Sequence, residues 1–149
     1  MTDSRSRHRF DFPDNFELWW STTYAVPPSS IDEYGHMTAV HYPVVFERAA
    51  SEFLIHALGT RLPDYVTAEL SVVYRHEVLL SRSPTRVYVR PTLLGTTTFR
   101  LCVILADATG TPCAQADIRY VAWDHESRTK QAMRPEERAS LQRHLDTVT

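Results

Sequence analysis

The longest regular pattern in the chain is that of an amphipathic α-helix over about 40–58, where apolar residues recur every three or four positions. Pro43 is tolerated only in the first turn of a helix, where its missing N–H has no intrahelical partner, so we expect the helix to begin just before it. Gly59 is typical of a helix end. The apolar face consists of Tyr42, Phe46, Ala49, Ala50, Phe53, Leu54, Ala57 and Leu58.

The remaining patterns are mostly those of β-strands. Apolar and polar residues alternate over 67–79, as in a strand with one buried face. Turn residues at 94–96 and 107–110 make short connections, which require antiparallel neighbours. Three further strands are predicted over 85–94, 98–106 and 113–123.

The two ends of the chain add one strand and one helix. An aromatic and β-branched segment over 16–26 predicts a first strand, which Pro27 and Pro28 end because neither continues a ladder of hydrogen bonds. Pro135 and the residues 136–145 predict a short polar helix. We expect this second helix on the surface rather than in the core.

This order of elements predicts an α+β domain, in which an antiparallel sheet of five or slightly more strands covers one central helix. Residues 1–13 have no periodicity and are expected to form a flexible N-terminal arm, and 14–149 a single domain. One helix cannot cover five long strands, and an open sheet edge remains. We therefore expect two copies to associate as a symmetric dimer.

Composition and charge narrow the range of partners. The formal net charge is −2, which provides no overall attraction to nucleic acid or to an anionic membrane, and we expect neither as a partner. The first residues lack the apolar core of a signal peptide and no apolar run approaches membrane-spanning length, so a cytoplasmic location is expected. Cys102 and Cys113 are expected to remain reduced thiols there.

The segment between the first strand and the helix carries the chemistry. Its sequence over 31–42 is IDEYGHMTAVHY, and Asp32, Gly35, His36, Met37 and Tyr42 have the spacing of a known motif. The segment resembles that of hot-dog-fold acyl-CoA thioesterases related to 4-hydroxybenzoyl-CoA thioesterase: Asp, two variable residues, Gly-His, an aliphatic residue, often Asn-Asn, then Tyr. The resemblance covers most of the chain and implies a hot-dog fold, in which the sheet wraps around the long helix.

The resemblance also implies a reaction, the hydrolysis of a small or medium acyl-CoA or acyl-carrier-protein thioester. Such a carbonyl needs a group that activates water or attacks it directly, and donors for the developing oxyanion. In the family this Asp is the general base or nucleophile, which here is Asp32. Backbone N–H groups at the helix start, near Ala39 and Val40, would form the oxyanion hole, reinforced by the helix dipole. A homodimer or a dimer of dimers is expected, with no cofactor beyond the coenzyme A of the substrate.

Several of these residues have alternative roles. Asp32 can instead accept hydrogen bonds from nearby N–H groups of its own loop, the common fate of an isolated Asp, although the surrounding motif favours catalysis. His36 is expected near the substrate mainly as a structural hydrogen-bonding residue. Tyr42 is expected in the core, with lining of the acyl pocket as the alternative.

Thr38 and Ala39 stand where the closest relatives usually carry Asn-Asn. Backbone donors survive this change, whereas side-chain hydrogen bonds do not. The change keeps a second function open, a hot-dog module that binds acyl-CoA without cleaving it. A hot-dog dehydratase is disfavoured, because those enzymes use a His-centred site on a different motif.

Other chemistries find little support. His36 and His41 lie five residues apart and the cysteines are distant in sequence, so no metal site is predicted. With no Gly-rich phosphate loop, the phosphates of coenzyme A would need arginine, although a solvated or cross-strand-paired side chain is expected first for each one. Trp19, Trp20 and Tyr24 can border an acyl pocket, but we expect core packing. The arginine candidates are Arg75, Arg82, Arg86, Arg90, Arg100 and Arg119.

Overall fold

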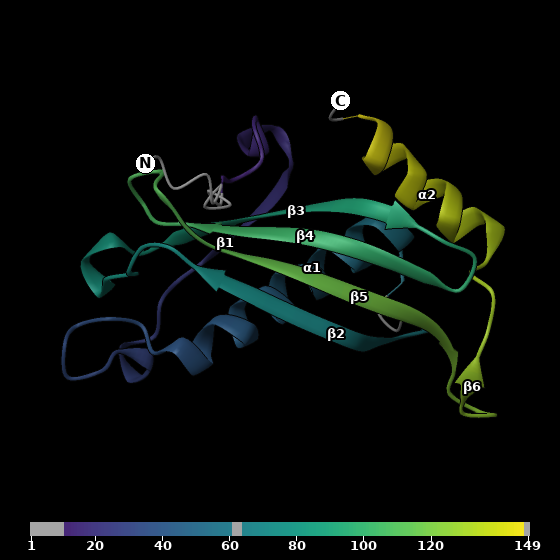
Figure 1. The fold of residues 1–149 in the computed structure, drawn as a ribbon, viewed down its shortest axis with the longest axis horizontal. Coiled ribbons are helices and arrows are strands. Elements are labelled where there is room, and N and C mark those ends of the chain that lie inside the picture. Colours follow the sequence, from purple (N-terminus) through teal and green to yellow (C-terminus); the bar gives the residue numbers. More distant parts are fainter. Residues whose placement is uncertain (1–10, 61–63, 148–149) are drawn as a thin grey trace, which may run out of the picture.

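The computed structural model describes residues 11–60 and 64–147. A curled antiparallel sheet lies across one long helix, α1 (Tyr42–Leu58), which runs behind it in Figure 1. The strand order is β1-β3-β4-β5-β2. The strands are β1 (Trp20–Tyr24), β2 (Tyr65–Tyr74), β3 (Thr85–Leu94), β4 (Thr98–Ala106), β5 (Pro112–Asp124) and the short β6 (Thr129–Lys130), which pairs with β5. The predicted α+β architecture is confirmed, while residues 1–10, most of the expected arm, lie outside the described residues.

Helix α1 follows the sequence pattern closely. It begins one residue before Pro43 and ends at Gly59, whose φ of 71° lies in the left-handed region that favours glycine. The 3-10 helix η3 (Ala39–His41) runs directly into α1, so helical backbone already begins at Ala39. Ala49 and Ala50 are buried, and their short side chains allow the sheet to approach closely.

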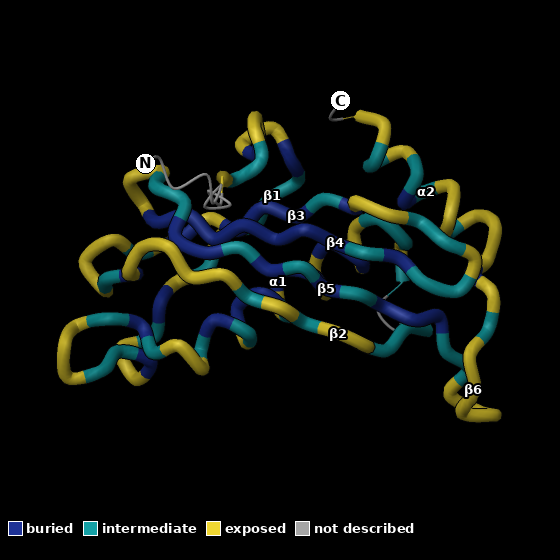
Figure 2. The backbone as a smooth tube through the Cα atoms, viewed as in Figure 1, coloured by how far each residue is buried: buried dark blue, intermediate teal, exposed yellow. Residues whose placement is uncertain are grey.

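The main core lies between α1 and the inner face of the sheet. Alternate residues of β3, β4 and β5 point toward the helix, as the strand pattern predicts. Figure 2 shows these middle strands as the most buried part of the sheet and β2 as the most exposed. The inward-facing residues of the middle strands include Val87, Val89, Leu101, Val103, Leu105, Ala114, Ala116 and Ile118.

A second apolar cluster lies on the outer face of the sheet and corrects one prediction. The first strand was expected from residue 16, but Phe16–Leu18 forms a 3-10 helix, η1, and β1 begins at Trp20. Phe16 and Trp19 fold onto the outer face, so β4 is buried on both sides. Propensity alone did not reveal this, because the burial of these aromatic rings depends on strands more than 60 residues away.

The C-terminal helix α2 (Pro135–Asp146) is confirmed, but its expected surface position is wrong for one residue. Leu141 is fully buried in the main core. Arg90 of β3 donates a hydrogen bond of 3.1 Å to the Leu145 carbonyl, and the ring of His144 lies edge-on to that of Phe53 in α1. Neither helix, nor any other helical segment of the described residues, is long and apolar enough to cross a membrane.

Strand β2 forms an edge of the sheet and is shorter than predicted. It pairs with β5, and within the described residues no strand pairs with its other side. The predicted alternation over 67–79 fails at its end, because β2 stops at Tyr74. The amides of Arg75 and His76 then both donate to the carbonyl of Cys113, and the chain turns away from the sheet. This exit creates one wall of the cleft described below.

Candidate active site

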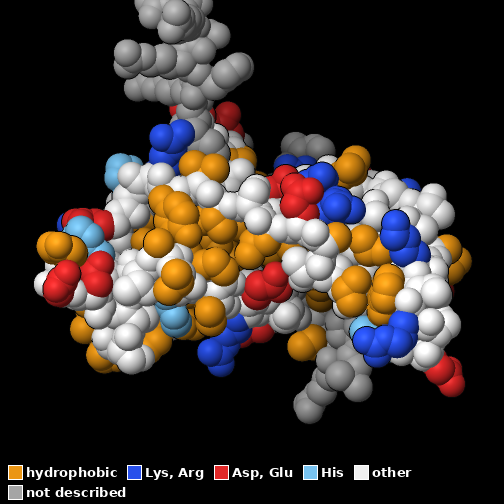
Figure 3. All heavy atoms as spheres, turned by 60° about the horizontal axis from the view of Figure 1, so that its bottom comes forward, with side chains coloured by type: hydrophobic (Ala, Val, Ile, Leu, Met, Phe, Trp, Pro, Cys, Tyr) orange, Lys and Arg blue, Asp and Glu red, His pale blue; other side chains and the backbone are white. Residues whose placement is uncertain are grey.

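A cleft of about 410 Å³ opens between the loop before α1 and the end of β2. Four predicted site residues line it, namely Asp32, His36, Ala39 and Tyr42. Val40 does not, and its side chain is 82% exposed. Figure 3 shows acidic and histidine side chains gathered beside hydrophobic ones at the end of the molecule where this loop lies. The full lining is Asp32, His36, Met37, Ala39, Tyr42, Tyr74, Arg75, His76 and Glu77.

The loop that carries Asp32 is a tight hairpin. Ile31 and Met37 form an isolated antiparallel bridge, and the Asp32 amide donates to the His36 carbonyl at 2.8 Å. Gly35 adopts a φ of 81°, a conformation that side-chain-bearing residues rarely accept. The loop is therefore a defined turn that presents Asp32 to the cleft.

The two carboxylate oxygens of Asp32 differ in their hydrogen bonding. Oδ1 accepts hydrogen bonds from the amides of Tyr34 at 2.9 Å and of His36 at 3.0 Å, the arrangement of an Asx turn. Oδ2 has no hydrogen-bond partner among residues 11–60 and 64–147. Oδ1 thus has the structural role that was the alternative for Asp32, since it accepts hydrogen bonds from its own loop. Oδ2 is available for chemistry in the cleft.

The second wall of the cleft is tied to this loop. The ring Nε2 of His36 lies 2.6 Å from Oε2 of Glu77, with both side chains nearly half exposed. The Met37 amide donates to the Val78 carbonyl at 2.9 Å, and His36 and Leu79 form an isolated bridge. His36 is therefore a hydrogen-bonding residue, as predicted, and it joins the loop to the chain that follows β2.

Tyr42 is both a core residue and a cleft residue. Its side chain is buried, and its ring lies edge-on to that of Tyr74 with centroids 4.8 Å apart. Burial raises the pKa of Tyr42 to about 12, and the Cys113 thiol group adds to the effect. The hydroxyl group therefore keeps its proton at neutral pH. The expected core position of Tyr42 is confirmed, and the residue also lines the cleft.

The start of the helical segment offers backbone donors next to Asp32. Its first hydrogen bond is donated by the His41 amide to the Thr38 carbonyl at 3.0 Å, which leaves the amides of Ala39 and Val40 without an intrahelical acceptor. No side chain caps this end. The helix dipole adds partial positive charge there, which favours an anion.

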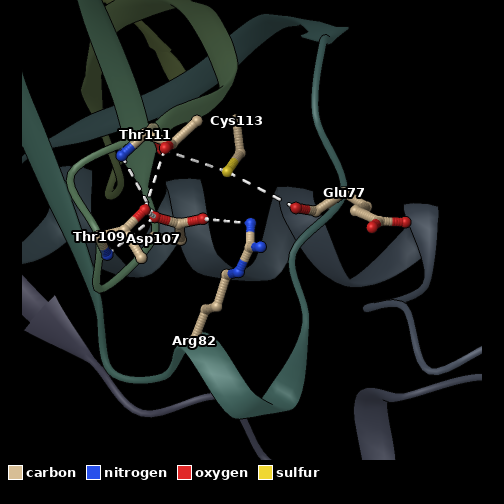
Figure 4. Close-up of polar contacts among 6 residues, drawn as sticks. All are labelled: Glu77, Arg82, Asp107, Thr109, Thr111 and Cys113. Carbon is tan, nitrogen blue, oxygen red and sulfur yellow. Dashed lines mark hydrogen bonds and ion pairs between the residues drawn. The ribbon is translucent and has the colours of Figure 1, made fainter.

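A buried carboxylate fixes the segment beyond Glu77 (Figure 4). Asp107, only 3% exposed, accepts hydrogen bonds from both the amide and the hydroxyl of Thr109 and from the amide of Thr111, and lies 3.6 Å from Arg82. Burial alone raises the pKa of Asp107, but these hydrogen bonds and the arginine outweigh it, so the pKa is lowered. Arg82 belongs to the 3-10 helix η4 (Leu80–Arg82), which is thereby tied to the β4–β5 turn.

Comparison with known families identifies the fold family. A model of the thioesterase-like superfamily matches residues 26–143, which is most of the chain. The chain belongs to the thioesterase-like superfamily. A search of curated proteins gave no match. The family assignment agrees with the resemblance that the motif around Asp32 carries.

Several solved structures have a similar fold. A predicted thioesterase from Bacillus stearothermophilus has a TM-score of 0.76 at 20% identity, covering 85% of this chain and 96% of its own. A thioesterase from Thermus thermophilus, complexed with coenzyme A and Zn, gives 0.72 at 18%, with 84% and 92% covered. A 1,4-dihydroxy-2-naphthoyl-CoA thioesterase from Synechocystis gives 0.70 at 13%, with 81% and 93% covered. At these identities the likeness establishes the hot-dog fold of this superfamily member.

The structure adds cleft residues that sequence analysis did not assign to the site. One wall is formed by Tyr74, the last residue of β2, and by Arg75, His76 and Glu77, which leave the strand that the sequence predicts to continue. The signal for them was present, because three consecutive charged or polar residues at 75–77 break the alternation of a half-buried strand. Within the described part of the chain, no three His, Cys, Asp or Glu side chains are grouped to hold a metal ion.

The arginine and aromatic residues considered in the sequence differ in whether they line the cleft. Of the six arginines considered for phosphate binding, Arg75 lines the cleft. The other five contact partners elsewhere. Arg86, Arg100 and Arg119 pair across strands, as expected. Arg82 and Arg90 instead contact a turn and helix α2. Trp20 and Tyr24 pack against the main core and Trp19 against the outer cluster, so the expected core packing is confirmed. The other pairs are Arg82 with Asp107, Arg86 with Ser21, Arg90 with Leu145, Arg100 with Asp117, and Arg119 with Glu69.

Proposed function

We propose that this protein hydrolyses a small or medium acyl-CoA or acyl-carrier-protein thioester, with Asp32 as general base or nucleophile. One observation carries the proposal: the Asp32 carboxylate lines the same cleft as the start of the helical segment, and its Oδ2 has no partner among the described residues. Membership in the thioesterase-like superfamily supports it, as does a fold neighbour bound to coenzyme A. The proposal needs no cofactor beyond the coenzyme A part of the substrate.

Asp32 can act in two ways. As a general base, Oδ2 takes a proton from water, the water oxygen bonds to the thioester carbonyl carbon, the C–S bond breaks, and the thiolate leaves and gains a proton. As a nucleophile, Oδ2 bonds to the carbonyl carbon and expels the thiolate, and water then hydrolyses the mixed anhydride. On either route the carbonyl oxygen becomes an anion, for which the amides of Ala39 and Val40 are the proposed donors. His36 and Tyr42 would line the bound substrate.

The competing function is a module that binds acyl-CoA without cleaving it. It is favoured by the hydrogen bonds at Oδ1 of Asp32, which by themselves account for an acid at this position. It is also favoured by the Thr38-Ala39 pair, which lacks the amide side chains of the family motif. Binding of coenzyme A thioesters without release of thiol would support this function.

The open edge of β2 motivates the proposal of a homodimer, or of a dimer of dimers. Val73 and Tyr74 at the end of this strand and Val40 and Val44 at the start of the helix are exposed apolar residues close to the cleft. A second copy would cover the edge and these side chains together. Sedimentation equilibrium tests the proposal, and a monomer at micromolar concentration would contradict it.

Substitution of Asp32 by Asn tests the reaction. Asn keeps an oxygen that accepts from the amides of Tyr34 and His36, so the turn is retained, but it is neither a base nor a carboxylate nucleophile. Thiol release from a panel of acyl-CoAs should fall by about 10²–10⁴-fold. Glu33, the exposed acid next in sequence, provides the matched control Glu33→Gln, which should keep full activity. Full activity of Asp32→Asn with an unchanged melting temperature would remove the assignment.

A further inference from the structure

We propose that Glu77 is a positioning residue for this reaction, acting on Asp32 through His36. The inference rests on the proposed function of Asp32. His36 contacts both carboxylates with different atoms. Its main-chain N–H donates to Oδ1 of Asp32 at 3.0 Å, and its ring Nε2 lies 2.6 Å from Oε2 of Glu77. The orientation of the Asp32 carboxylate therefore depends on where His36 is held.

The second donor to Asp32 provides no comparable anchor. Tyr34 also donates its amide to Oδ1, but its side chain is 75% exposed. Gly35, between the two donors, has a φ of 81° and open space around its α-carbon, so packing does not restrain the turn there. Of the two residues that bind the carboxylate, His36 is the one whose side chain is tied to the opposite wall.

Glu77 lies on a rigid part of the chain. Val78, next to it, is fully buried and accepts the Met37 amide at 2.9 Å. The carbonyl of Glu77 accepts the thiol of Cys113 at 3.7 Å, a long contact that adds little. Five residues after Glu77, Arg82 ties η4 to the buried Asp107. The contact between His36 and Glu77 thus connects the glycine-containing turn to a well-packed segment.

Because His36 and Glu77 are exposed to solvent, a role of their contact in positioning can be distinguished from a role in stabilising the fold. The side chains of His36 and Glu77 are 42% and 48% exposed. Even an ion pair exposed to this degree contributes little to folding stability. A shift of a reacting group by about 1 Å, in contrast, can lower turnover about a hundredfold. Removal of Glu77 should therefore lower kcat while the melting temperature stays close to that of the wild type.

The test is a double-mutant cycle measured by thiol release. Glu77→Ala is expected to lower kcat by roughly tenfold to a hundredfold with little change in KM. Glu77→Gln should recover part of this loss, because the amide oxygen still accepts a hydrogen bond from the histidine ring. In a His36→Ala background, which keeps the main-chain N–H to Asp32, Glu77→Ala should have no further effect. Glu33→Gln, a charge change in the same loop, is the control and should leave kcat unchanged.

Each result decides between the possibilities. If Glu77→Ala lowers kcat in the wild type but not in the His36→Ala background, positioning through His36 is supported. The positioning role is wrong if the wild type is active and Glu77→Ala is fully active as well. It is also wrong if the losses in kcat from Glu77→Ala and His36→Ala multiply in the double variant. Both outcomes leave the proposed function standing. A wild type that releases no thiol from any thioester overturns both. Should Glu77→Ala fail to fold, the same cycle with Glu77→Gln gives the answer.

Discussion

The hydroxyl group of Tyr74 donates a hydrogen bond of 2.9 Å to the carbonyl oxygen of Ala39. That carbonyl belongs to the same planar peptide unit as the amide N–H of Val40, so the bond fixes the direction in which this N–H points. It also polarises the unit and makes the N–H a better donor. The end of β2 therefore controls one of the two backbone donors proposed for the oxyanion.

Substitution of Tyr74 by Phe tests this relationship. The ring contact with Tyr42 is retained, and only the hydrogen bond to Ala39 is lost. Because Tyr74 is exposed to solvent, the free energy of unfolding should fall by no more than about 1 kcal/mol. We expect kcat for thioester hydrolysis to fall several-fold, as the Val40 amide loses its orientation. Unchanged steady-state kinetics would show that this peptide unit takes no part in the reaction.

Arg75 lines the cleft beside Asp32, and we predict that it contacts the phosphates of the substrate. Loss of a charge-assisted hydrogen bond costs about 1.5–3 kcal/mol, so Arg75→Ala should raise KM for acyl-CoA by roughly tenfold or more. The effect should shrink at high salt. Arg86→Ala, which removes an arginine bonded to Ser21 on β1, is the control and should leave KM unchanged. Isothermal titration with coenzyme A measures the same difference without turnover.

The docking of α2 should depend on pH through His144. Its imidazole lies against Phe53, and burial lowers the pKa, with further lowering by His56 and Arg143. The unfolded chain has the ordinary pKa of about 6.5, so it binds a proton more readily than the folded protein. The stability that neutral His144 contributes is therefore complete above pH about 6.5 and is lost as the pH falls through the lowered folded value.

Denaturation by urea between pH 7.5 and pH 5 measures this dependence. The wild type should lose stability relative to His144→Gln as the pH falls, because the variant has no imidazole to protonate. His125→Gln, on the exposed turn before β6, is the control and should follow the wild type. Parallel curves for the wild type and His144→Gln would contradict the assignment.

The carboxylate of Asp107 should contribute more to the stability of the protein than the similarly bonded carboxylate of Asp124. Asp107→Asn loses the charge that faces Arg82 and weakens three buried hydrogen bonds, so we expect a loss of about 1–3 kcal/mol in the free energy of unfolding. Asp124 accepts similar hydrogen bonds in the exposed turn between β5 and β6, and Asp124→Asn should have a smaller effect. Because the folded pKa of Asp107 is lowered, its contribution is present above its ordinary value of 3.8 and disappears in stronger acid.

Much of the fold followed from local patterns in the sequence. The limits of α1 were predictable because Pro43 and Gly59 restrict the backbone wherever they occur, and β3, β4 and β5 because alternation and short turns specify antiparallel pairs. The candidate site was predicted from the resemblance of its motif to that of hot-dog thioesterases, and this motif can be read locally because Asp32, Gly35 and His36 lie within a single turn. The turn that holds Asp32 is closed by hydrogen bonds between residues that are at most four positions apart.

Tertiary structure decided the features that depend on distant partners. Glu77 meets His36 across 41 positions, and Tyr74 meets Ala39 across 35. The charged residues at 75–77 indicate where the strand ends, but no local pattern indicates that this end faces the Asp32 loop across a cleft. Leu141 is the one buried residue of a polar helix, too little for a periodic signal. Local sequence determines the secondary structure that a segment prefers by itself. Burial and long-range pairing depend instead on the distant residues that pack against the segment in the folded chain.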